Sequence, residues 1–124
     1  MTTSAKQDSY PYQNEPIWSK SEKAIARRVF DAALKRELQD VLEETKQKAN
    51  QIKEPANVWE LERYLTQRRK EIDRKYEFRA SQLTRVFGTL LYEGRVTEEE
   101  LRGLRENKLK AIRSCAKVLA VDAA

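Results

Sequence analysis

Apolar side chains recur at three- and four-residue steps through residues 25–52, the spacing of an amphipathic helix with one buried stripe. Ser19 and Glu22 stand just before this stripe and predict a capping box at its start. Pro55 disfavours helical geometry in the residue before it. We therefore expect a first long helix over residues 19–53. The stripe consists of Ile25, Val29, Phe30, Ala33, Leu34, Leu38, Val41, Leu42, Thr45, Ala49 and Ile52.

A second stripe follows the proline and continues to the end of a second helix. Asn57 is a suitable N-cap with Glu60 three residues later, and Gly94 suits a left-handed cap at the other end. The spacing predicts one continuous helix over residues 57–93. Its apolar positions are Leu61, Leu65, Ile72, Tyr76, Ala80, Leu83, Val86, Phe87, Leu90 and Leu91.

A third helix is expected over residues 97–119. Thr97 and Glu100 form a second capping-box pattern, and Val96 is placed to pack on Leu101 as a hydrophobic staple. Residues 1–17 lack a helical period and contain two prolines, so we interpret them as a flexible tail. Residues 18–120 then form a single helical domain.

The predicted helices are too long for a compact monomer of this size. About 35 residues at 1.5 Å per residue give a rod of roughly 50 Å. Each rod of an isolated hairpin has one long neighbour, which leaves much of its apolar stripe in water. We expect an all-α fold of two long antiparallel helices with a shorter C-terminal helical head, assembled as an extended homodimer. The alternative is a bent, compact three-helix monomer.

Composition supports a helical protein without enzyme chemistry. Only three Gly and three Pro occur in 124 residues, too few for the turns of a many-stranded sheet. There is no His and a single Cys115, which excludes the usual zinc sites, His-based nucleophilic triads and an internal disulfide. No Gly-rich phosphate loop is present. We expect no catalytic residue, no metal and no cofactor.

The charge is mixed rather than simply basic. The net charge of +5 arises from 25 basic and 20 acidic residues spread along the chain. No apolar run approaches the roughly 20 residues that span a bilayer, so no integral membrane segment is expected. We interpret the chain as a soluble intracellular protein.

The middle helix carries the candidate binding residues. Arg68, Arg69 and Lys75 border its apolar stripe, where a guanidinium or ammonium group usually meets a carboxylate, in this chain or in another. Arg69 and Asp73 stand four apart and can pair on the helix surface, as can Glu71 and Lys75. The simpler interpretation is a solvated face of alternating charges.

Trp59 stands in the first turn of this helix and has two interpretations. A tryptophan with nearby arginines makes a good interface centre, because it buries a large area with few rotatable bonds. Alternatively, Trp59 is a core residue that pins the connection between the first two helices. Trp18 is interpreted as a hydrophobic lid on the first helix.

Several segments together resemble the cyanobacterial fluorescence recovery protein family. The resemblance extends from Trp18 and the Arg36-Glu37-Leu38 stretch to about Ile112, and its ordered combination is more specific than any one piece. The segments are Trp59-Glu60-Leu61, Arg68-Arg69-Lys70-Glu71-Ile72-Asp73, Lys75-Tyr76, Arg79 and Val86-Phe87-Gly88-Thr89-Leu90-Leu91-Tyr92-Glu93-Gly94.

This resemblance implies a non-enzymatic regulator of photoprotection. Members of the family are helical homodimers that bind the photoactivated, red orange carotenoid protein, chiefly through its C-terminal domain. They accelerate its reversion to the orange form and its detachment from the phycobilisome, so that quenching ends and antenna fluorescence recovers. The implied location is the cytoplasm, at the cytoplasmic face of the thylakoid membrane near phycobilisomes, and no cofactor is implied.

The resemblance also implies which residues bind. Trp59 and Arg69 match residues at the family's dimer interface and partner surface, and the head region supplies further contacts. The chain departs from the family pattern at Arg63, where the family has an Asp; Glu62 is the neighbouring carboxylate. The expected partner-binding and dimer surface is Trp59, Glu62, Arg63, Arg69, Asp73 and Tyr76, and the expected head contacts are Phe87 and Leu91.

Two other classes of function remain open from the residues alone. A basic helical protein can bind nucleic acid, with an affinity that falls steeply with salt. Acidic residues interleave with every basic cluster and argue against that class, so no nucleic-acid partner is expected. A dimeric helical adaptor for an unrelated protein fits the residue pattern equally well.

Overall fold

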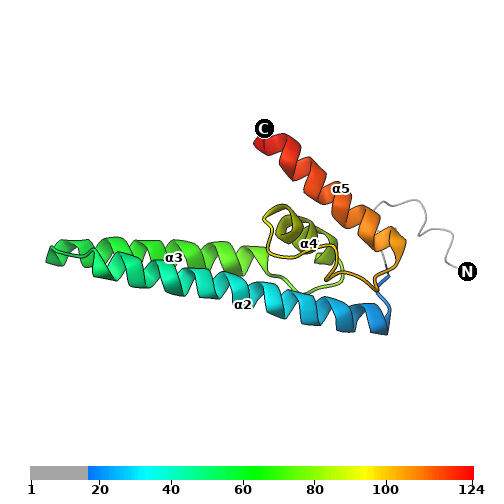
Figure 1. Cartoon of the computed structure of the whole chain (residues 1–124), viewed down its shortest axis with the longest axis horizontal. Helices are drawn as coiled ribbons and strands as arrows, with labels where there is room; N and C mark the ends of the chain where they lie inside the picture. Colours follow the sequence, from blue (N-terminus) through cyan, green and yellow to red (C-terminus); the bar gives the residue numbers. More distant parts are fainter. Residues whose placement is uncertain (1–16) are drawn as a thin grey trace, which may run out of the picture.

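The fold is a long helical hairpin with a smaller group of helices at one end (Figure 1). The computed structural model describes residues 17–124, and within that range it is all helical, without a named strand. The all-α prediction is therefore confirmed. The elements are α2 (Lys20–Asn50), the short 3-10 helix η2 (Pro55–Asn57), α3 (Val58–Lys75), α4 (Leu83–Tyr92) and α5 (Glu106–Ala123).

The molecule has two regions, a stem and a head. The stem, residues 37–75, is the second half of α2 with η2 and α3, which run side by side. The head, residues 17–36 and 76–124, combines the first half of α2 with α4, α5 and their connections. Figure 1 shows α4 beside the hairpin at the end of α3, and α5 slanting away from the stem. The expected tail, residues 1–17, lies outside the described residues except for Ile17, which is 85% exposed.

The start of α2 forms as predicted. The Glu22 amide donates to the Ser19 hydroxyl at 3.2 Å, and the Ser19 amide donates to the Glu22 carboxylate at 3.0 Å. The predicted cap of α3 is right in position, since Asn57 is the N-cap residue, but its side chain makes no capping hydrogen bond. Asn57 already has helical backbone angles, and its side-chain oxygen accepts from the Glu54 amide instead of from α3. Pro55 begins the 3-10 turn that precedes α3.

The prediction of one helix over residues 57–93 is wrong, because α3 ends at Lys75. Tyr76 takes an extended backbone, and α4 begins only at Leu83. The break brings the rings of Tyr76 and Phe78 edge-on to Phe30, at centroid distances of 5.4 and 5.1 Å. Residues two apart on a continuous helix point to different faces, so both rings reach Phe30 only if the helix is interrupted. Gly94 adopts the expected positive φ, 77°, beyond the end of α4.

The third helix also begins later than predicted, at Glu106 instead of residue 97. The Thr97 and Glu100 capping box forms, with hydrogen bonds of 3.2 and 3.0 Å, but it closes only a turn. Gly103 then has φ +105°, and a Cβ there would lie 2.6 Å from a side-chain carbon of Ile25. This close approach and positive φ redirect the chain before α5 starts.

The head encloses one apolar core. The Trp18 ring packs on Phe87 with centroids 6.4 Å apart, so Trp18 is a core residue, 4% exposed, and not only a lid on α2. Apolar faces of α4 and α5 and of the first half of α2 complete the cluster. Gly88 lets α4 and α5 approach closely, since a Cβ there would lie 2.5 Å from Cys115 Cβ. The core residues are Trp18, Ala26, Val29, Phe30, Ala33, Leu83, Val86, Phe87, Leu90, Val96, Leu101, Leu104 and Ile112.

Candidate functional site

The stem leaves apolar side chains at its surface. Leu38 is 50% exposed, Leu42 46% and Leu65 39%, although all three lie on the predicted apolar stripes. Ile72 is the only buried residue of α3. A groove of about 1000 Å³ runs between α2 and α3 over this surface. It is lined by Leu34, Leu38, Val41, Glu62, Leu65, Thr66, Arg68, Arg69, Lys70, Ile72 and Asp73.

Four of the expected site residues form one row along α3. Trp59, Glu62, Arg69 and Asp73 follow one another at helical intervals, with Thr66 between them. Glu62, Arg69 and Asp73 line the groove, and Trp59 continues the row toward the tip of the stem. We call Trp59, Glu62, Thr66, Arg69 and Asp73 the α3 row. It combines an aromatic anchor with both signs of charge on one rigid helix.

The α3 row is open to solvent. Trp59 is 63% exposed, so the interpretation of this residue as a core pin is wrong. Glu62 accepts a hydrogen bond from Thr66 at 3.0 Å. The expected Arg69–Asp73 pair is absent, and neither residue has an ion-pair partner within residues 17–124. Arg63 is likewise exposed, beside the row. These charges remain available to another molecule.

The other expected contacts lie in the head or at its junction with the stem. Phe87 is 0% exposed and packs on Trp18, so a partner does not reach it while the head is folded. We correct its expected role from contact to support of the head. Leu91 is partly buried against the same core. Tyr76 is half-buried, and its hydroxyl donates to Glu37 at 2.9 Å.

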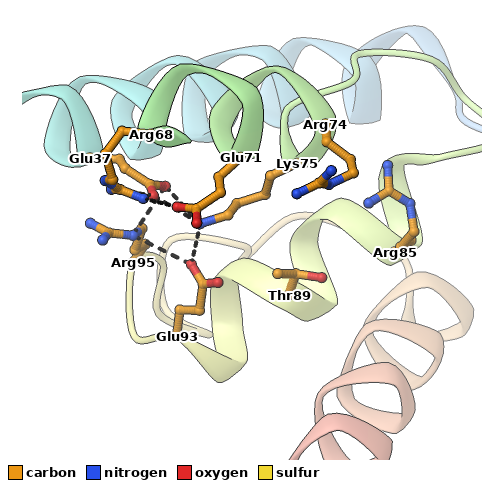
Figure 2. Close-up of a pocket in the computed structure, with 9 residues that line it drawn as sticks. All are labelled: Glu37, Arg68, Glu71, Arg74, Lys75, Arg85, Thr89, Glu93 and Arg95. Carbon is orange, nitrogen blue, oxygen red and sulfur yellow. Dashed lines mark hydrogen bonds and ion pairs between the residues drawn. The ribbon is translucent and has the colours of Figure 1, made fainter. Parts of the chain in front are cut away.

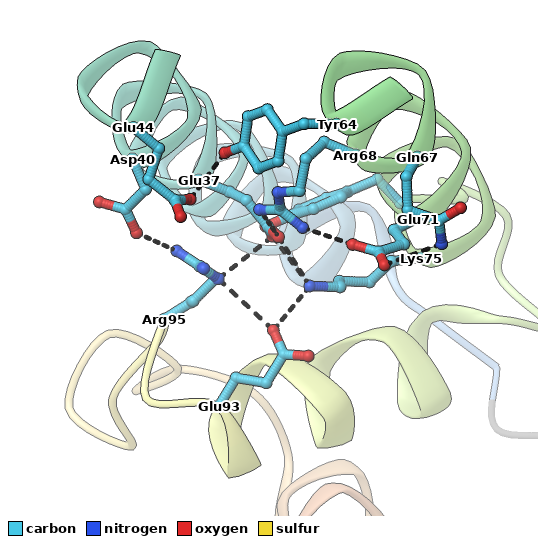
Figure 3. A network of polar contacts seen from close by, with 11 residues as sticks. Glu37, Asp40, Glu44, Tyr64, Gln67, Arg68, Glu71, Lys75, Glu93 and Arg95 are labelled. Atoms are coloured by element: carbon cyan, nitrogen blue, oxygen red, sulfur yellow. Dashed lines mark hydrogen bonds and ion pairs between the residues drawn. The ribbon is translucent and has the colours of Figure 1, made fainter. Parts of the chain in front are cut away.

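Glu37 is the centre of an ion-pair cluster where the stem meets the head (Figure 3). Its side chain is 1% exposed, and its carboxylate accepts from Arg68 at 3.0 Å and from Lys75 at 2.9 Å. Arg95 Nε lies 3.2 Å away, an electrostatic contact without hydrogen-bond geometry. Glu93 bridges from α4 to Lys75 at 2.7 Å. The expected carboxylate partner of Arg68 and Lys75 is therefore on α2 of the same chain.

This cluster fixes the protonation states of its members. Burial pushes the pKa of the Glu37 carboxyl upward, but hydrogen bonds led by that from Lys75 bring it below its ordinary value. Burial, together with the hydrogen bond to Glu37, raises the pKa of the Tyr76 hydroxyl. Burial alone would lower the pKa of the Arg68 guanidinium, but its hydrogen bonds to Glu71 and Glu37 outweigh burial, so the pKa is raised above its ordinary value. Glu37 is thus an anion and Tyr76 a neutral donor near neutral pH.

A second buried carboxylate, Glu22, joins the two ends of the head. It accepts from the Arg105 amide at 2.9 Å and from Lys108 at 3.2 Å, and both Glu22 and Lys108 are 1% exposed. Burial raises the pKa of Glu22, but hydrogen bonds from the Arg105 and Ser19 amides and from Lys108 lower it to about 2. The start of α2 is thereby fixed to the start of α5.

Sequence reasoning missed both buried carboxylates. Glu37 does carry a signal, because it falls on the stripe between Leu34 and Val41, where an apolar residue is expected. A charge at such a position indicates a buried partner. Glu22 carries no comparable signal, since its capping role already accounts for it.

Over residues 17–124, no group of three or more His, Cys, Asp or Glu side chains is arranged to hold a metal ion. Within the same residues, every helix is too short or too polar to cross a membrane.

Comparisons with known proteins give one consistent result. The family model described as photoprotection regulator fluorescence recovery protein matches residues 18–116. The fluorescence recovery protein of Synechocystis sp. (strain PCC 6803) is 38% identical over 104 residues, which cover 84% of this chain and 95% of that protein.

Solved structures agree with this match. The fluorescence recovery protein of Fremyella diplosiphon superposes with a TM-score of 0.77 at 36% identity, covering 82% of this chain and 99% of that one. That of Synechocystis sp. PCC 6803 gives a TM-score of 0.77 at 38% identity, with the same coverage. The chain therefore belongs to the photoprotection regulator fluorescence recovery protein family.

Proposed function

We propose that this regulator binds the red, photoactivated form of the orange carotenoid protein, mainly through that protein's C-terminal domain. Binding accelerates reversion to the orange form and detachment from the phycobilisome, which ends quenching and restores antenna fluorescence. Membership of the family supports this role. The site of action is the cytoplasm, at the cytoplasmic face of the thylakoid membrane.

The working form is a homodimer that pairs along the stem. The half-exposed leucines of the groove support this assembly, since a second stem removes them from water at about 25 cal/mol per Å² of apolar surface. An apolar face on a two-fold axis meets its own copy and is self-complementary. The head needs no such help, because its core is already enclosed.

The observation that carries the proposal is the α3 row. Trp59 offers a large apolar surface, and Arg69 offers a guanidinium without an ion-pair partner among residues 17–124. Both project from a helix, so the backbone that carries them is already ordered when a partner binds. To accelerate reversion, the regulator must bind the transition state between the red and orange forms more tightly than it binds the red form. The row would hold one domain of the partner while its halves reassociate.

The test is the recovery of photoconverted orange carotenoid protein in the dark, followed by absorbance. Trp59→Ala and Arg69→Ala are expected to slow recovery at least tenfold, as loss of an interface anchor does. Arg28→Ala, an exposed arginine of the head, serves as the matched control and is expected to keep the wild-type rate. Sedimentation of each variant separates loss of partner binding from loss of the dimer. Wild-type rates in both row variants would refute the assignment.

A further inference from the structure

A cleft of about 700 Å³ lies between α3 and α4, where the stem meets the head (Figure 2). Five cationic and three carboxylate side chains line it, together with Thr89. Its three carboxylates are Glu37, Glu71 and Glu93. The cationic side chains of the cleft therefore outnumber its carboxylates by two.

The carboxylates of the cleft are already occupied by three of its cations. Arg68 bonds Glu37 and Glu71, at 3.0 and 2.6 Å. Lys75 bridges Glu37 and Glu93, at 2.9 and 2.7 Å. Arg95 lies against the same two groups at 3.2 and 3.4 Å. The charges of this part of the lining sum to zero, and each carboxylate has a cation of the same chain beside it.

The excess charge comes from Arg74 and Arg85. Arg74 has no hydrogen bond or ion pair through its side chain within the described chain. Arg85 donates to Gln82 at 2.9 Å and lies 3.6 Å from Glu77, a weak contact that leaves part of its guanidinium free. Figure 2 shows the two side chains entering the cleft from α3 and from α4. Two cations that line one cleft without an anion bound between them repel.

Thr89 and the direction of α4 complete an anion site. Thr89 stands four residues after Arg85 and so shares its helix face, lining the same cleft. Arg85 lies in the first turn of α4, where the helix dipole also favours negative charge. Two guanidinium groups and a hydroxyl are the donors that carboxylates and phosphates bind.

We propose that Arg74, Arg85 and Thr89 form an anion subsite that accepts a carboxylate side chain of the protein partner. The inference rests on the proposed function, which supplies that partner. Arg74 follows Asp73, the last residue of the α3 row, but points about 100° away from it around the helix, so a partner on the row reaches the subsite by extending around the head end of α3. A free anion binds weakly to such exposed arginines, whereas a carboxylate held there by a docked partner acts at high effective concentration.

The test compares two charge-matched double variants in binding to the red orange carotenoid protein. Arg74→Gln with Arg85→Gln removes the subsite cations, and Arg28→Gln with Lys117→Gln removes the same charge from exposed positions outside the cleft. We expect the first to bind at least tenfold more weakly, with a shallower dependence on salt, and the control to stay within twofold. Circular dichroism checks that both variants keep their helices.

Two outcomes would overturn the inference. Equal affinities of the two double variants, with strong binding by the wild type, would contradict the subsite and leave the proposed function intact. The second arm titrates inorganic phosphate into the free wild-type chain while the arginine side-chain NMR signals are followed. Phosphate binding at Arg74 and Arg85 combined with unchanged partner affinity would identify a site for a free anion. A wild type that does not bind the partner at all would instead refute the proposed function.

Discussion

The head and the stem use the same kinds of residue with opposite results. In the head, Leu83 and Leu90 are 1% and 0% exposed, enclosed by α2, α4 and α5. In the stem, Leu38 and Leu65 are 50% and 39% exposed, because two helices alone cover only one side of each other. The difference teaches that a helical stripe predicts a buried face but not what buries it.

The charged residues divide in the same way. In the head and at the junction, buried carboxylates are matched with cations of the same chain, as Glu22 is with Lys108 and Glu37 with Lys75. On the α3 row, Arg69 and Asp73 stay unpaired among the described residues. The buried carboxylates are therefore satisfied within the chain, whereas the unpaired charges of the α3 row lie along the stem.

The largest effect is expected from Leu83→Ala in the head. The side chain is 1% exposed, and its removal leaves a cavity, so the free energy of unfolding should fall by about 2–5 kcal/mol. Urea denaturation followed by circular dichroism measures this. A loss below 1 kcal/mol would mean that the head core is not the main source of stability.

At the junction, Glu37→Gln should destabilise by about 1–3 kcal/mol, because it leaves three cations around a neutral amide. The loss is smaller than for a fully buried pair, since the Arg68 and Lys75 side chains are 17% and 14% exposed to water. Glu71→Gln, whose side chain is 37% exposed, is the control and should change stability little. Equal losses in the two variants would show that the burial of Glu37 does not matter.

Strong acid should weaken the head and the junction, because their buried carboxylates are stabilised as anions in the folded chain. The pKa of Glu22 is about 2 in the folded chain, below its ordinary value of 4.5. A lowered pKa contributes stability that is complete above pH 4.5 and is lost as the pH falls to about 2. The pKa values of Glu37 and Glu100 are lowered in the same way.

Thermal unfolding between pH 6 and 2 should show this loss as a falling melting temperature, and Glu22→Gln should make the dependence of the melting temperature on pH shallower. A melting temperature independent of pH would contradict these pKa shifts.

The smallest effect on the fold is expected from Leu65→Ala in the stem, the counterpart of Leu83→Ala. Because this leucine is already 39% exposed, the unfolding free energy of the separate chain should change by no more than about 0.5 kcal/mol. The dimer should nevertheless dissociate more readily. Urea denaturation at a protein concentration below the dimer dissociation constant measures the unfolding free energy of the single chain. A loss as large as that of Leu83→Ala would remove the contrast between the two regions.

The two capping boxes of this molecule were predictable from sequence, and the distant contacts were not. Both capping boxes join residues three apart, so their pattern is visible in the sequence, and both form. The end of α3 depends on Phe30, which lies 46 positions before Tyr76. The start of α5 depends on the bond between Glu22 and the Arg105 amide, 83 positions apart. No local pattern specifies such contacts.

The candidate site shows the same limit. The alignment of Trp59, Arg69 and Asp73 on one face follows from helical periodicity alone, and their exposure agrees with a binding surface. The burial of Phe87 was not foreseen, because which turn of an apolar stripe faces the core depends on the packing of α4 against Trp18. Glu37 was missed because its partners come from two other elements.

The central claim, that the open face of the stem is covered by a second copy of the chain, is tested most directly by sedimentation equilibrium at micromolar concentration. The wild type is expected to give twice the chain mass of 14.6 kDa, and Leu65→Glu, which places a charge in the groove, is expected to give the single-chain mass. A wild-type protein that stays at 14.6 kDa across the micromolar range would contradict the claim.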